Sequence, residues 1–461
     1  MRILLVDLKS RDGFVSKDTV AGGYGSRLRP FSKVTKAVCQ LKRRFHELPS
    51  VQLAYLAAIA ARAGHEVLVS SGEFVDADLA IVLSSLVDYR RETAWAVTMR
   101  RRGTPVGFVG LAASKLPELF EPAADFIVIG EPEAAMLRLV AGETLTGRVV
   151  SPDIERLDTL PFPRWDLATG PRRRIGVPFA GRPVGGSFPV LASRGCPEFC
   201  TYCPHRILSG HRARSVSNIV DEITALATAH RRPHIVFRDP LFTEDRGRVT
   251  ALCRAVIEKA LVLTFECETR LDRLDPDLLT LMHRAGLRAM SFGVEAQSAT
   301  TLKKVGRRPI PEAHQRSIVQ HCRQLGIVTA AFYVFGFPDD DWASVNASID
   351  YAVELGSTVA QFKVLTPYPG TPLYNRMAST ITETNWERFD GFTPTFTHPK
   401  LSQEQLIFLL GAAYTRFYMR PSYVANYLRV TGPRIRHFVT RLDERVERMH
   451  LRRDALMARG Q

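Results

Sequence analysis

The stretch SRGCPEFCTYCP, residues 193–204, contains three of the seven cysteines of the chain, Cys196, Cys200 and Cys203. It follows an extended apolar run at 188–192, so we expect a loop that leaves the end of a β-strand. Three thiolates this close along a loop can all point at one iron–sulfur cluster, which Cys thiolates normally hold in fours. With only three ligands, a [4Fe–4S] cluster keeps one iron open to another molecule. The spacing therefore predicts a cluster with a reactive position.

Two other interpretations of these cysteines remain open. A disulfide framework needs paired cysteines in an oxidising compartment, and three in eight residues cannot pair among themselves. A structural zinc site needs four ligands, and His205 or His211 could complete one. The open cluster is the interpretation that a three-ligand loop shaped by Gly195 favours.

The order Cys196-x3-Cys200-x2-Cys203, with Tyr202 just before the last cysteine, resembles the signature of the radical S-adenosylmethionine (SAM) enzymes. This resemblance implies that the open iron chelates the amino and carboxylate groups of SAM, with Tyr202 among the SAM-binding residues. It also implies that an electron from the cluster cleaves SAM to methionine and a 5′-deoxyadenosyl radical. The electron would come from a donor of the flavodoxin or ferredoxin type.

Length and composition indicate a globular protein of two or three domains, with 461 residues, 45% of them apolar and 24% charged. No uncharged apolar run of about 18 residues suggests a transmembrane helix. The odd cysteine number and the early Asp7, which argues against a signal peptide, favour a cytoplasmic protein. The net charge of +15 favours acidic partners or simply reflects arginine-rich composition. Nucleic acid is not favoured, because no RNA-binding motif with interleaved aromatics is present.

Residues 1–145 read as a doubly wound, Rossmann-like α/β domain with a parallel sheet, because apolar runs alternate with helical stretches. A polar loop at 8–48 follows the first strand. In such sheets ligands bind beyond the carboxyl ends of the strands. The predicted strands are 2–7, 65–69, 77–83, 105–110 and 125–130, and the predicted helices are 49–63 and 88–102.

This domain resembles the cobalamin-binding domain of cobalamin-dependent radical SAM enzymes, through QLAYLAA at 52–58, AGHEV at 63–67 and IGEPE at 129–133. The resemblance implies cobalamin at the strand ends. The Asp-x-His-x-x-Gly motif that supplies a cobalt ligand is absent, so loop 8–48, which carries His46, would cover the lower face of cobalt. A sheet without cofactor is the alternative, because fold does not imply function. The candidate cobalamin contacts are Ser84, Ser85, Gly110, Gly130 and Glu131.

A linker rich in Pro, Gly and Arg is expected at 146–187, followed by a partial (β/α)6 TIM barrel at 188–375. In barrels, residues at the carboxyl ends of the strands carry the chemistry. Polar residues stand at these ends, which packing alone does not predict: Asp239, Glu268, Arg270 and Glu295. The predicted strands are 189–192, 234–238, 263–268, 289–294, 329–335 and 360–365.

The shape of SAM suggests tasks for three of these residues. Its carboxylate needs a cation, and Arg270 could supply a bidentate pair. Its ribose hydroxyls and amino group need acceptors, which Glu268 and Glu295 could provide. The turn at 335–339 resembles the fifth-strand turn of the family, which implies that Gly336 lets the backbone approach the adenine. The alternative for each charged residue is a surface salt bridge.

Residues 376–461 are expected to form a helical C-terminal region, with one helix at 401–416. A basic amphipathic stretch at 433–461 can lie on an anionic membrane, giving peripheral membrane contact. It can equally cover the open side of the barrel, which is the commoner use of such a helix.

The combined resemblances predict a cobalamin-dependent radical SAM enzyme, most simply a methyltransferase acting on an unactivated carbon of a lipid or natural-product substrate. A radical cyclase or rearrangement enzyme with the same cofactors is the alternative. A tRNA methylthiotransferase is disfavoured, because Cys39 is the one cysteine of residues 1–150 and cannot hold a second cluster. A non-catalytic zinc or nucleic-acid-binding protein is the simplest competing interpretation.

Overall fold

Six parallel strands form the first sheet, in the order β4-β1-β5-β6-β7-β8. The computed structural model describes residues 1–10, 12, 14–17, 23–28, 48–168, 186–421 and 423. From β1 the chain moves to one side for β4 and to the other for β5, so the sheet is doubly wound and opens a crevice beyond the carboxyl ends of β1 and β5. The strands are β1 Arg2–Val6, β4 Glu66–Ser70, β5 Leu79–Leu83, β6 Val106–Val109, β7 Phe126–Gly130 and β8 Gly147–Ser151.

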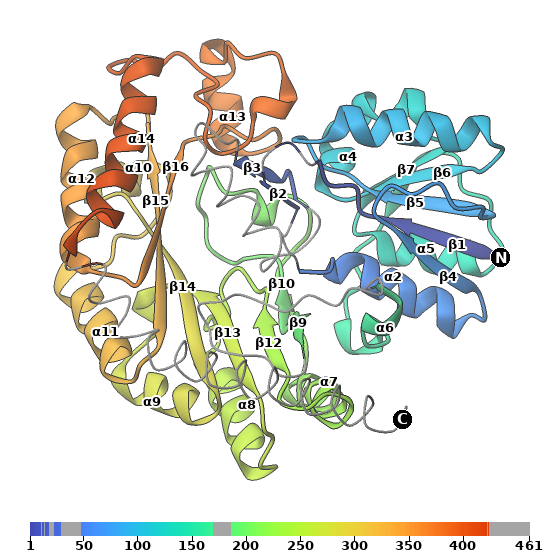
Figure 1. Ribbon diagram of the computed structural model, residues 1–461, viewed down its shortest axis with the longest axis horizontal. Helices are drawn as coiled ribbons and strands as arrows, with labels where there is room; N and C mark the ends of the chain where they lie inside the picture. The colour runs from blue at the N-terminus through green and yellow to red at the C-terminus, as the bar shows by residue number, and fades with distance from the viewer. Residues whose placement is uncertain are drawn as a thin grey trace, which may run out of the picture.

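Helices cover both faces of this sheet, as Figure 1 shows at its right side. Alternate residues of β1 point to opposite faces: Ile3 and Leu5 pack with α2 and α5, whereas Leu4 and Val6 pack with α3 and α4. Strands buried on both faces must be apolar throughout, which explains why their runs were predicted from the sequence. The helices are α2 Val51–Arg62, α3 Tyr89–Arg101, α4 Leu111–Lys115 and α5 Pro132–Val140.

Strand β8 was not predicted, because it lies in the segment expected to be a linker. Its residues alternate between exposed and buried, and it pairs with β7 at the edge of the sheet. A five-residue edge strand with only two apolar residues gives a weak pattern. The first sheet therefore extends to Ser151, past the expected boundary at residue 145. Within the predicted polar loop, β2 (Phe14–Ser16) and β3 (Ser26–Leu28) form an antiparallel ribbon.

The second sheet contains six parallel strands in chain order, β9-β12-β13-β14-β15-β16, each near a predicted strand. A helix follows each of the next four strands after β9, and α7 follows β9 after a long loop. The α/β class with parallel sheets is thus confirmed. The strands are β9 Ser187–Val190, β12 His234–Phe237, β13 Thr264–Thr269, β14 Leu287–Glu295, β15 Val328–Phe335 and β16 Val359–Val364. The helices are α7 Val216–Ala229, α8 Arg246–Glu258, α9 Pro276–Arg284, α10 Ala299–Lys304, α11 Glu312–Gln324 and α12 Trp342–Leu355.

The two faces of the second sheet differ in burial. Strands β13 and β16 alternate strictly between buried and partly exposed residues. The buried set, such as Phe265 and Phe362, joins the core under the helices, while the other face carries Glu268, Glu295 and Lys363. Parallel strands are usually covered on both faces. A polar, partly exposed inner face is therefore the surface of this fold that can receive a ligand.

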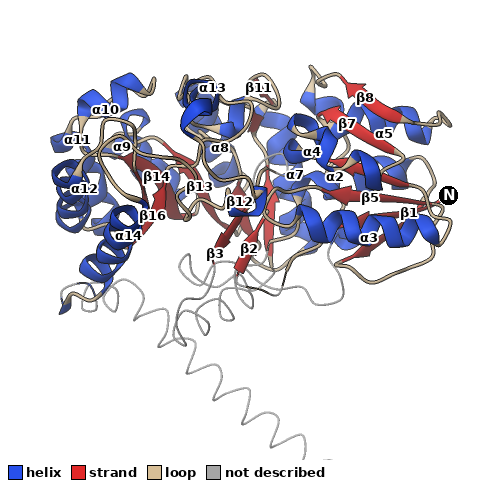
Figure 2. Ribbon diagram, turned by 90° about the horizontal axis from the view of Figure 1, so that it is seen from above, coloured by secondary structure: helices blue, strands red, loops and turns tan. Residues whose placement is uncertain are grey.

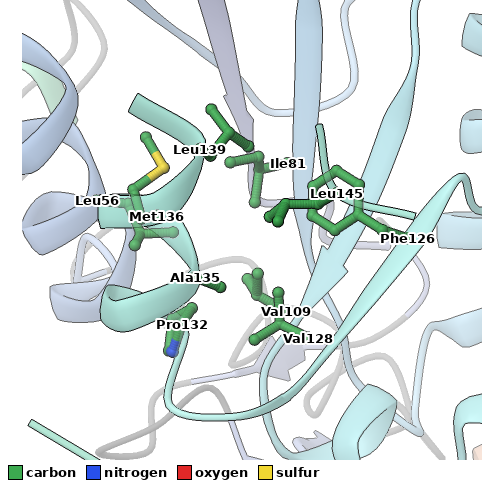
Figure 3. Close-up of a pocket in the computed structure, with 10 residues that line it drawn as sticks. All are labelled: Leu56, Ile81, Val109, Phe126, Val128, Pro132, Ala135, Met136, Leu139 and Leu145. Carbon is green, nitrogen blue, oxygen red and sulfur yellow. The ribbon is translucent and has the colours of Figure 1, made fainter. Parts of the chain in front are cut away.

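One hydrophobic core runs through both sheets, from β1 to β16. Trp165 of α6 (Trp165–Ala168) lies 6.4 Å from Phe188 of β9, ring centre to ring centre, and joins the two halves. Figure 3 shows an apolar cavity of about 10 Å³ between α2, α5 and the first sheet. Its lining residues are all apolar, so it is a packing gap rather than a site.

Helix α14 (Gln403–Tyr418) protects the edge of the second sheet and confirms the helix predicted at 401–416. The hydroxyls of Tyr414 and Tyr418 each accept from a backbone N–H of β16 and donate to a carbonyl of the same strand, at 2.6–3.3 Å. These bonds satisfy groups that an open edge would expose. The basic stretch 433–461 lies outside the described residues. Within the described ranges, no helix is long and apolar enough to cross a bilayer.

The remaining elements are short. Helix α13 (Pro372–Met377) follows β16 and lies with α10 along the upper edge of the view in Figure 2. The strands β10 (Ser193–Arg194) and β11 (Arg212–Ala213) form an antiparallel ribbon. The 3-10 helices are η1 Pro117–Leu119, η2 Glu121–Ala123, η3 Leu157–Thr159, η4 Pro204–Arg206, η5 Leu271–Arg273, η6 Ala378–Thr380 and η7 Trp386–Arg388.

Candidate active site

The three cysteines lie on one loop, residues 195–211, between the strands of the β10–β11 ribbon. Gly195 begins this loop with φ +69°, and a Cβ there would stand 2.6 Å from the carbonyl oxygen of Gly210. Only glycine therefore fits where the two ends of the loop meet. Asp239, after β12, fixes the start of the loop by accepting from the Ser193 hydroxyl (2.6 Å) and from the backbone N–H before it (3.0 Å). We call residues 195–211 the cysteine loop.

The three thiols are buried or half-buried and interact electrostatically with one another. Burial raises the pKa of Cys196 and raises the pKa of Cys203 to about 12. The guanidinium Nη1 of Arg307 lies 3.8 Å from the Cys200 sulfur. Among the described residues, no three His, Cys, Asp or Glu side chains converge closely enough to chelate one metal ion. A cubane cluster places its thiolates on different iron atoms, so a cluster does not require such convergence.

Glu295 and Tyr202 meet beside the cysteine loop. Glu295 ends β14 with φ +69°, an unfavourable conformation for a non-glycine residue, and a bulge precedes it. Burial raises the pKa of Glu295, opposed by Arg307 at 3.6 Å and by a hydrogen bond from Tyr202. The Tyr202 ring packs edge-on against Phe337, with ring centres 5.4 Å apart. The strained backbone thus aims a buried carboxylate at the cysteine loop.

Arg270 is buried and only partly paired. Its Nε and Nη2 donate to the carboxylate of Asp272 (3.0 and 2.9 Å), and Nη2 also donates to the carbonyl of Arg308. Its buried Nη1 has no hydrogen-bond partner among the described residues. The bidentate pairing expected for SAM is therefore taken by Asp272, while the guanidinium also interacts electrostatically with Cys196 and Glu295. A buried donor without a partner is costly unless a ligand satisfies it.

The predicted acceptor Glu268 is paired within the protein. Its Oε1 accepts from Nη1 of Arg238 at 2.6 Å. Both side chains interact electrostatically with His205, as does Lys363 from β16. Burial lowers the pKa of His205, partly offset by Glu268. The inner face of the sheet thus carries a polar cluster of mixed charge next to the cysteine loop.

Gly336 follows β15, as predicted, and the structure explains why this position is occupied by glycine. Its φ is +88°, and a Cβ there would meet the side chain of Leu406 of α14 at 3.2 Å. The backbone N–H groups of Gly336 and Phe337 both donate to the Asp340 carboxylate at 3.0 Å. Backbone conformation and helix packing therefore require the glycine, independently of any adenine.

Ser84 and Ser85 follow β5 but are fully buried and already hydrogen-bonded. The Ser84 hydroxyl donates to the carbonyl of Val109 (2.7 Å) and accepts from the backbone N–H of Ala113 (3.0 Å). The Ser85 hydroxyl donates to Glu92 at 2.6 Å. The Ser84 hydroxyl therefore joins the ends of β5 and β6, and the Ser85 hydroxyl joins the segment after β5 to α3. The sequence alone did not reveal these bonds.

Gly110 follows β6 with φ +106°, and Gly130 ends β7 with φ +108°. A Cβ at Gly130 would stand 2.5 Å from the carbonyl oxygen of Ser151. Both positions require glycine for the backbone alone. Their predicted contact with cobalamin remains a prediction.

Glu131 binds the cysteine loop, and its predicted contact with cobalamin stays a prediction. Its carboxylate accepts from Arg194 (3.0 Å) and Arg212 (2.6 Å), which flank the loop, and from Ser209 within it. Glu133 accepts from the same Arg194 at 2.8 Å. Burial alone would raise the pKa of Glu131, but Arg194 and Arg212 hold it below its usual value. One carboxylate from the first sheet thus ties both ends of the cysteine loop.

Parts of the predicted loop 8–48 lie over the carboxyl edge of the first sheet. The Lys17 ammonium is buried there, 2.7 Å from Glu92 and 3.8 Å from Asp7. The Tyr24 ring stacks on Tyr368, with ring centres 5.1 Å apart, and the Tyr24 hydroxyl donates to the carbonyl of Pro369. His46 and Cys39 lie outside the described residues.

The structure therefore gathers the cysteines, Tyr202, Arg270 and Glu295 at one place, with Glu268 beside them. Arg307 was not predicted, because it lies in the loop after α10 rather than at the end of a strand. A basic residue twelve positions after Glu295 had no local pattern that marked it.

Residues 190–352 match the family model of the Radical SAM superfamily. The match begins at the end of β9, continues into α12 and contains the three cysteines, Arg270, Glu295 and Arg307. This part of the chain is therefore a radical SAM domain, which confirms the resemblance of the cysteine motif.

Particular relatives cover more of the chain. The "Uncharacterized methyltransferase PH0819" of Pyrococcus horikoshii is 29% identical over 65% of this chain and 68% of its own length. The anaerobic magnesium-protoporphyrin IX monomethyl ester cyclase of Rubrivivax gelatinosus is 26% identical over 66% of this chain and 58% of its own length. The radical SAM methyltransferase TsrM of Kitasatospora setae, solved with cobalamin and a [4Fe–4S] cluster, superposes with a TM-score of 0.63. It is 16% identical and covers 91% of this chain and 89% of its own, so the two share a fold.

The contact of Glu131 with the cysteine loop gives a first prediction. Glu131→Gln leaves Arg194 and Arg212 buried with reduced charge compensation, and breaking a buried pair costs about 3 kcal/mol or more. We expect a lower unfolding temperature and faster amide hydrogen exchange in residues 195–211. Glu143→Gln, which alters an exposed pair with Arg138, is the matched control and should change neither. Equal exchange in both variants would show that Glu131 does not fix the loop.

Proposed function

We propose that this protein is a cobalamin-dependent radical SAM methyltransferase that acts on an unactivated carbon of a lipid or natural-product substrate. The observation that carries the proposal is the position of three thiols at the carboxyl end of a sheet whose inner face is polar and partly exposed. When bound, the cluster and SAM would supply a 5′-deoxyadenosyl radical, and cobalamin would supply the methyl group.

In this proposal Cys196, Cys200 and Cys203 hold the [4Fe–4S] cluster. The partly buried thiols suit it, because metal coordination favours the thiolate that burial alone disfavours. The unpaired Nη1 of Arg270 and the buried guanidinium of Arg307 suit the carboxylate of SAM.

Glu295 and Tyr202 complete the proposed SAM site. Glu295 provides an acceptor for the SAM amino group or ribose, held in place by its strained backbone and by Tyr202. The paired Glu268 stands further along the inner face, where it would orient the substrate with Arg238 and Lys363. These side chains bind and orient, while the cofactors carry the chemistry.

The first sheet is the proposed cobalamin domain, and the second sheet the proposed partial (β/α)6 barrel. Support comes from the crevice at the carboxyl ends of β1 and β5 and from the fold shared with a cobalamin-containing methyltransferase. Glu131 follows β7 and binds the cysteine loop, so this sheet edge and the proposed cluster face one another. Such an arrangement brings a methyl donor and a radical generator to a common space.

A cyclase with the same cofactors is the second candidate. It is favoured by the similarity to the ester cyclase of Rubrivivax gelatinosus, which spans two thirds of this chain. Both functions share the cluster and SAM, so they differ in the fate of the SAM methyl group.

The cluster assignment is tested by Cys196→Ala. Anaerobically reconstituted protein should lose most of its iron and should no longer form 5′-deoxyadenosine from SAM under dithionite, because two thiolates cannot retain the cluster. Cys253→Ala, a buried cysteine of α8, is the control and should keep both. A Cys196→Ala protein with full iron and wild-type SAM cleavage would refute the assignment.

Methyl transfer is tested with SAM carrying a labelled methyl group. Reconstituted protein should retain cobalamin in about equimolar amount after gel filtration, as expected for one specific site. A strong reductant is included, because cobalamin must be reduced before it can accept a methyl cation from SAM. After acid quench, the label should appear in the corrinoid fraction, even without substrate. Formation of 5′-deoxyadenosine with no label on the corrinoid would instead favour the cyclase.

A further inference from the structure

Arg307 is a buried cation whose guanidinium contacts one of the three thiols. Only 9% of its side chain is exposed. Its Nη1 donates to the sulfur of Cys200 at 3.8 Å, which is within hydrogen-bonding range for sulfur. Cys200 is the buried member of the three cysteines, so water screens this contact only weakly. A permanent positive charge therefore lies against one sulfur of the proposed cluster site.

The backbone on both sides of Cys200 holds Arg307 in this place. Before Cys200, the contact is with Gly306, which has φ +73°. A Cβ at Gly306 would overlap the carbonyl oxygen of the residue that precedes Cys200. After Cys200, the backbone N–H and the hydroxyl of Thr201 both donate to the carbonyl of Val305, at 2.9 and 3.1 Å. The segment that carries the guanidinium is therefore fixed against the cysteine loop immediately around this thiol.

The second terminal nitrogen of Arg307, Nη2, has structural partners. It donates to the carbonyl of Gly293 in β14 and lies 3.6 Å from Oε1 of Glu295. These contacts hold the end of β14 beside its bulge, and a purely structural role for Arg307 would need nothing more. The contact of Nη1 with the Cys200 sulfur goes beyond that role.

The guanidinium keeps its charge in this environment, as arginine does in proteins generally. Burial alone would lower the pKa of Arg307, but Tyr202, Glu295 and Cys200 hold it above its usual value. Glu295 compensates the positive charge only in part, because burial raises the pKa of its own carboxyl group. The thiol of Cys200 therefore faces a cation with incomplete compensation.

The function proposed above, on which this inference rests, begins with a one-electron reduction. One electron passes from a reductant, dithionite in vitro, to the cluster, which changes from [4Fe–4S]²⁺ to [4Fe–4S]⁺. This step adds a negative charge next to the three thiolates. Net charge and hydrogen bonds to the sulfurs set the potential of an iron–sulfur cluster. A buried cation that donates to a sulfur favours the reduced state, so it raises the reduction potential.

We propose that Arg307 sets the reduction potential of the cluster by holding its positive charge and an N–H donor against the Cys200 sulfur. The guanidinium makes the cluster easier to reduce before SAM binds. This effect does not need SAM, which separates it experimentally from the role of the same guanidinium in binding the SAM carboxylate.

The experiment is a potentiometric titration of the reconstituted full chain without SAM, followed by the electron paramagnetic resonance signal of [4Fe–4S]⁺. Arg307→Met and Arg307→Gln remove the charge, and the glutamine keeps a donor for the carbonyl of Gly293. Arg307→Lys keeps the charge. The matched control is Arg308→Met, which removes the neighbouring cation, whose side chain is 59% exposed. Iron content is measured for each variant, so that only protein with a complete cluster is compared.

At the midpoint potential of the wild type, we expect the ratio of reduced to oxidised cluster to fall about 10-fold in Arg307→Met and Arg307→Gln. This change corresponds to about 59 mV for a one-electron couple. Arg307→Lys should recover most of the loss, because it restores the charge. Arg308→Met should match the wild type, because water screens an exposed charge.

Any of four results would overturn the inference. An unchanged potential in the uncharged variants would show that Arg307 does not act on the cluster. An equal shift in Arg307→Lys would point to a distorted loop rather than to charge, and an equal shift in Arg308→Met to the general charge of the surface. Loss of iron from both uncharged variants would assign Arg307 to cluster assembly. A wild type that holds no four-iron cluster would instead refute the proposed function.

Discussion

The cysteine loop follows a strand of the second sheet but is held in place by a residue next to the first sheet, and the rest of the site depends on this contact. Both ends of the loop carry an arginine, and one buried carboxylate, Glu131 of the first sheet, accepts from both. Charged groups out of water persist only when they are paired with good geometry. The two sheets therefore cannot separate without exposing or orphaning these charges. The distance between the carboxyl edge of the first sheet and the three thiols is fixed by this contact.

The site also requires a strand face of the second sheet that a ligand can reach. A parallel sheet buried on both faces offers a ligand only its edge. Here β13 and β16 alternate between core residues and partly exposed polar residues, so the inner face carries Glu268, Glu295 and Lys363 toward the cysteine loop. The strained Glu295 and the unpaired nitrogen of Arg270 lie in the same region. Strain and an unsatisfied buried donor are costs that a folded protein retains where a ligand offsets them.

Most of the fold could be predicted from the sequence, because strands buried on both faces must be apolar and helices between them follow a clear period. Strand β8 was missed because an edge strand needs few apolar residues. The site was harder to predict. Residues at strand ends, such as Glu295, could be found by position, whereas Arg307 comes from a loop. The protein partners of Glu131 and Ser84 could not be predicted, because no local pattern reveals that Glu131 pairs with Arg194 or that the Ser84 hydroxyl donates to Val109.

The central claim is that three thiolates leave one iron of the cluster free to bind SAM. Electron paramagnetic resonance of the reduced, reconstituted protein tests it most directly, because ligand binding at an iron changes the spectrum of the cluster. We expect a [4Fe–4S]⁺ signal whose g-values shift when SAM is added and return when SAM is removed. A four-iron signal that SAM leaves unchanged, at concentrations at which SAM binds the protein, would contradict it.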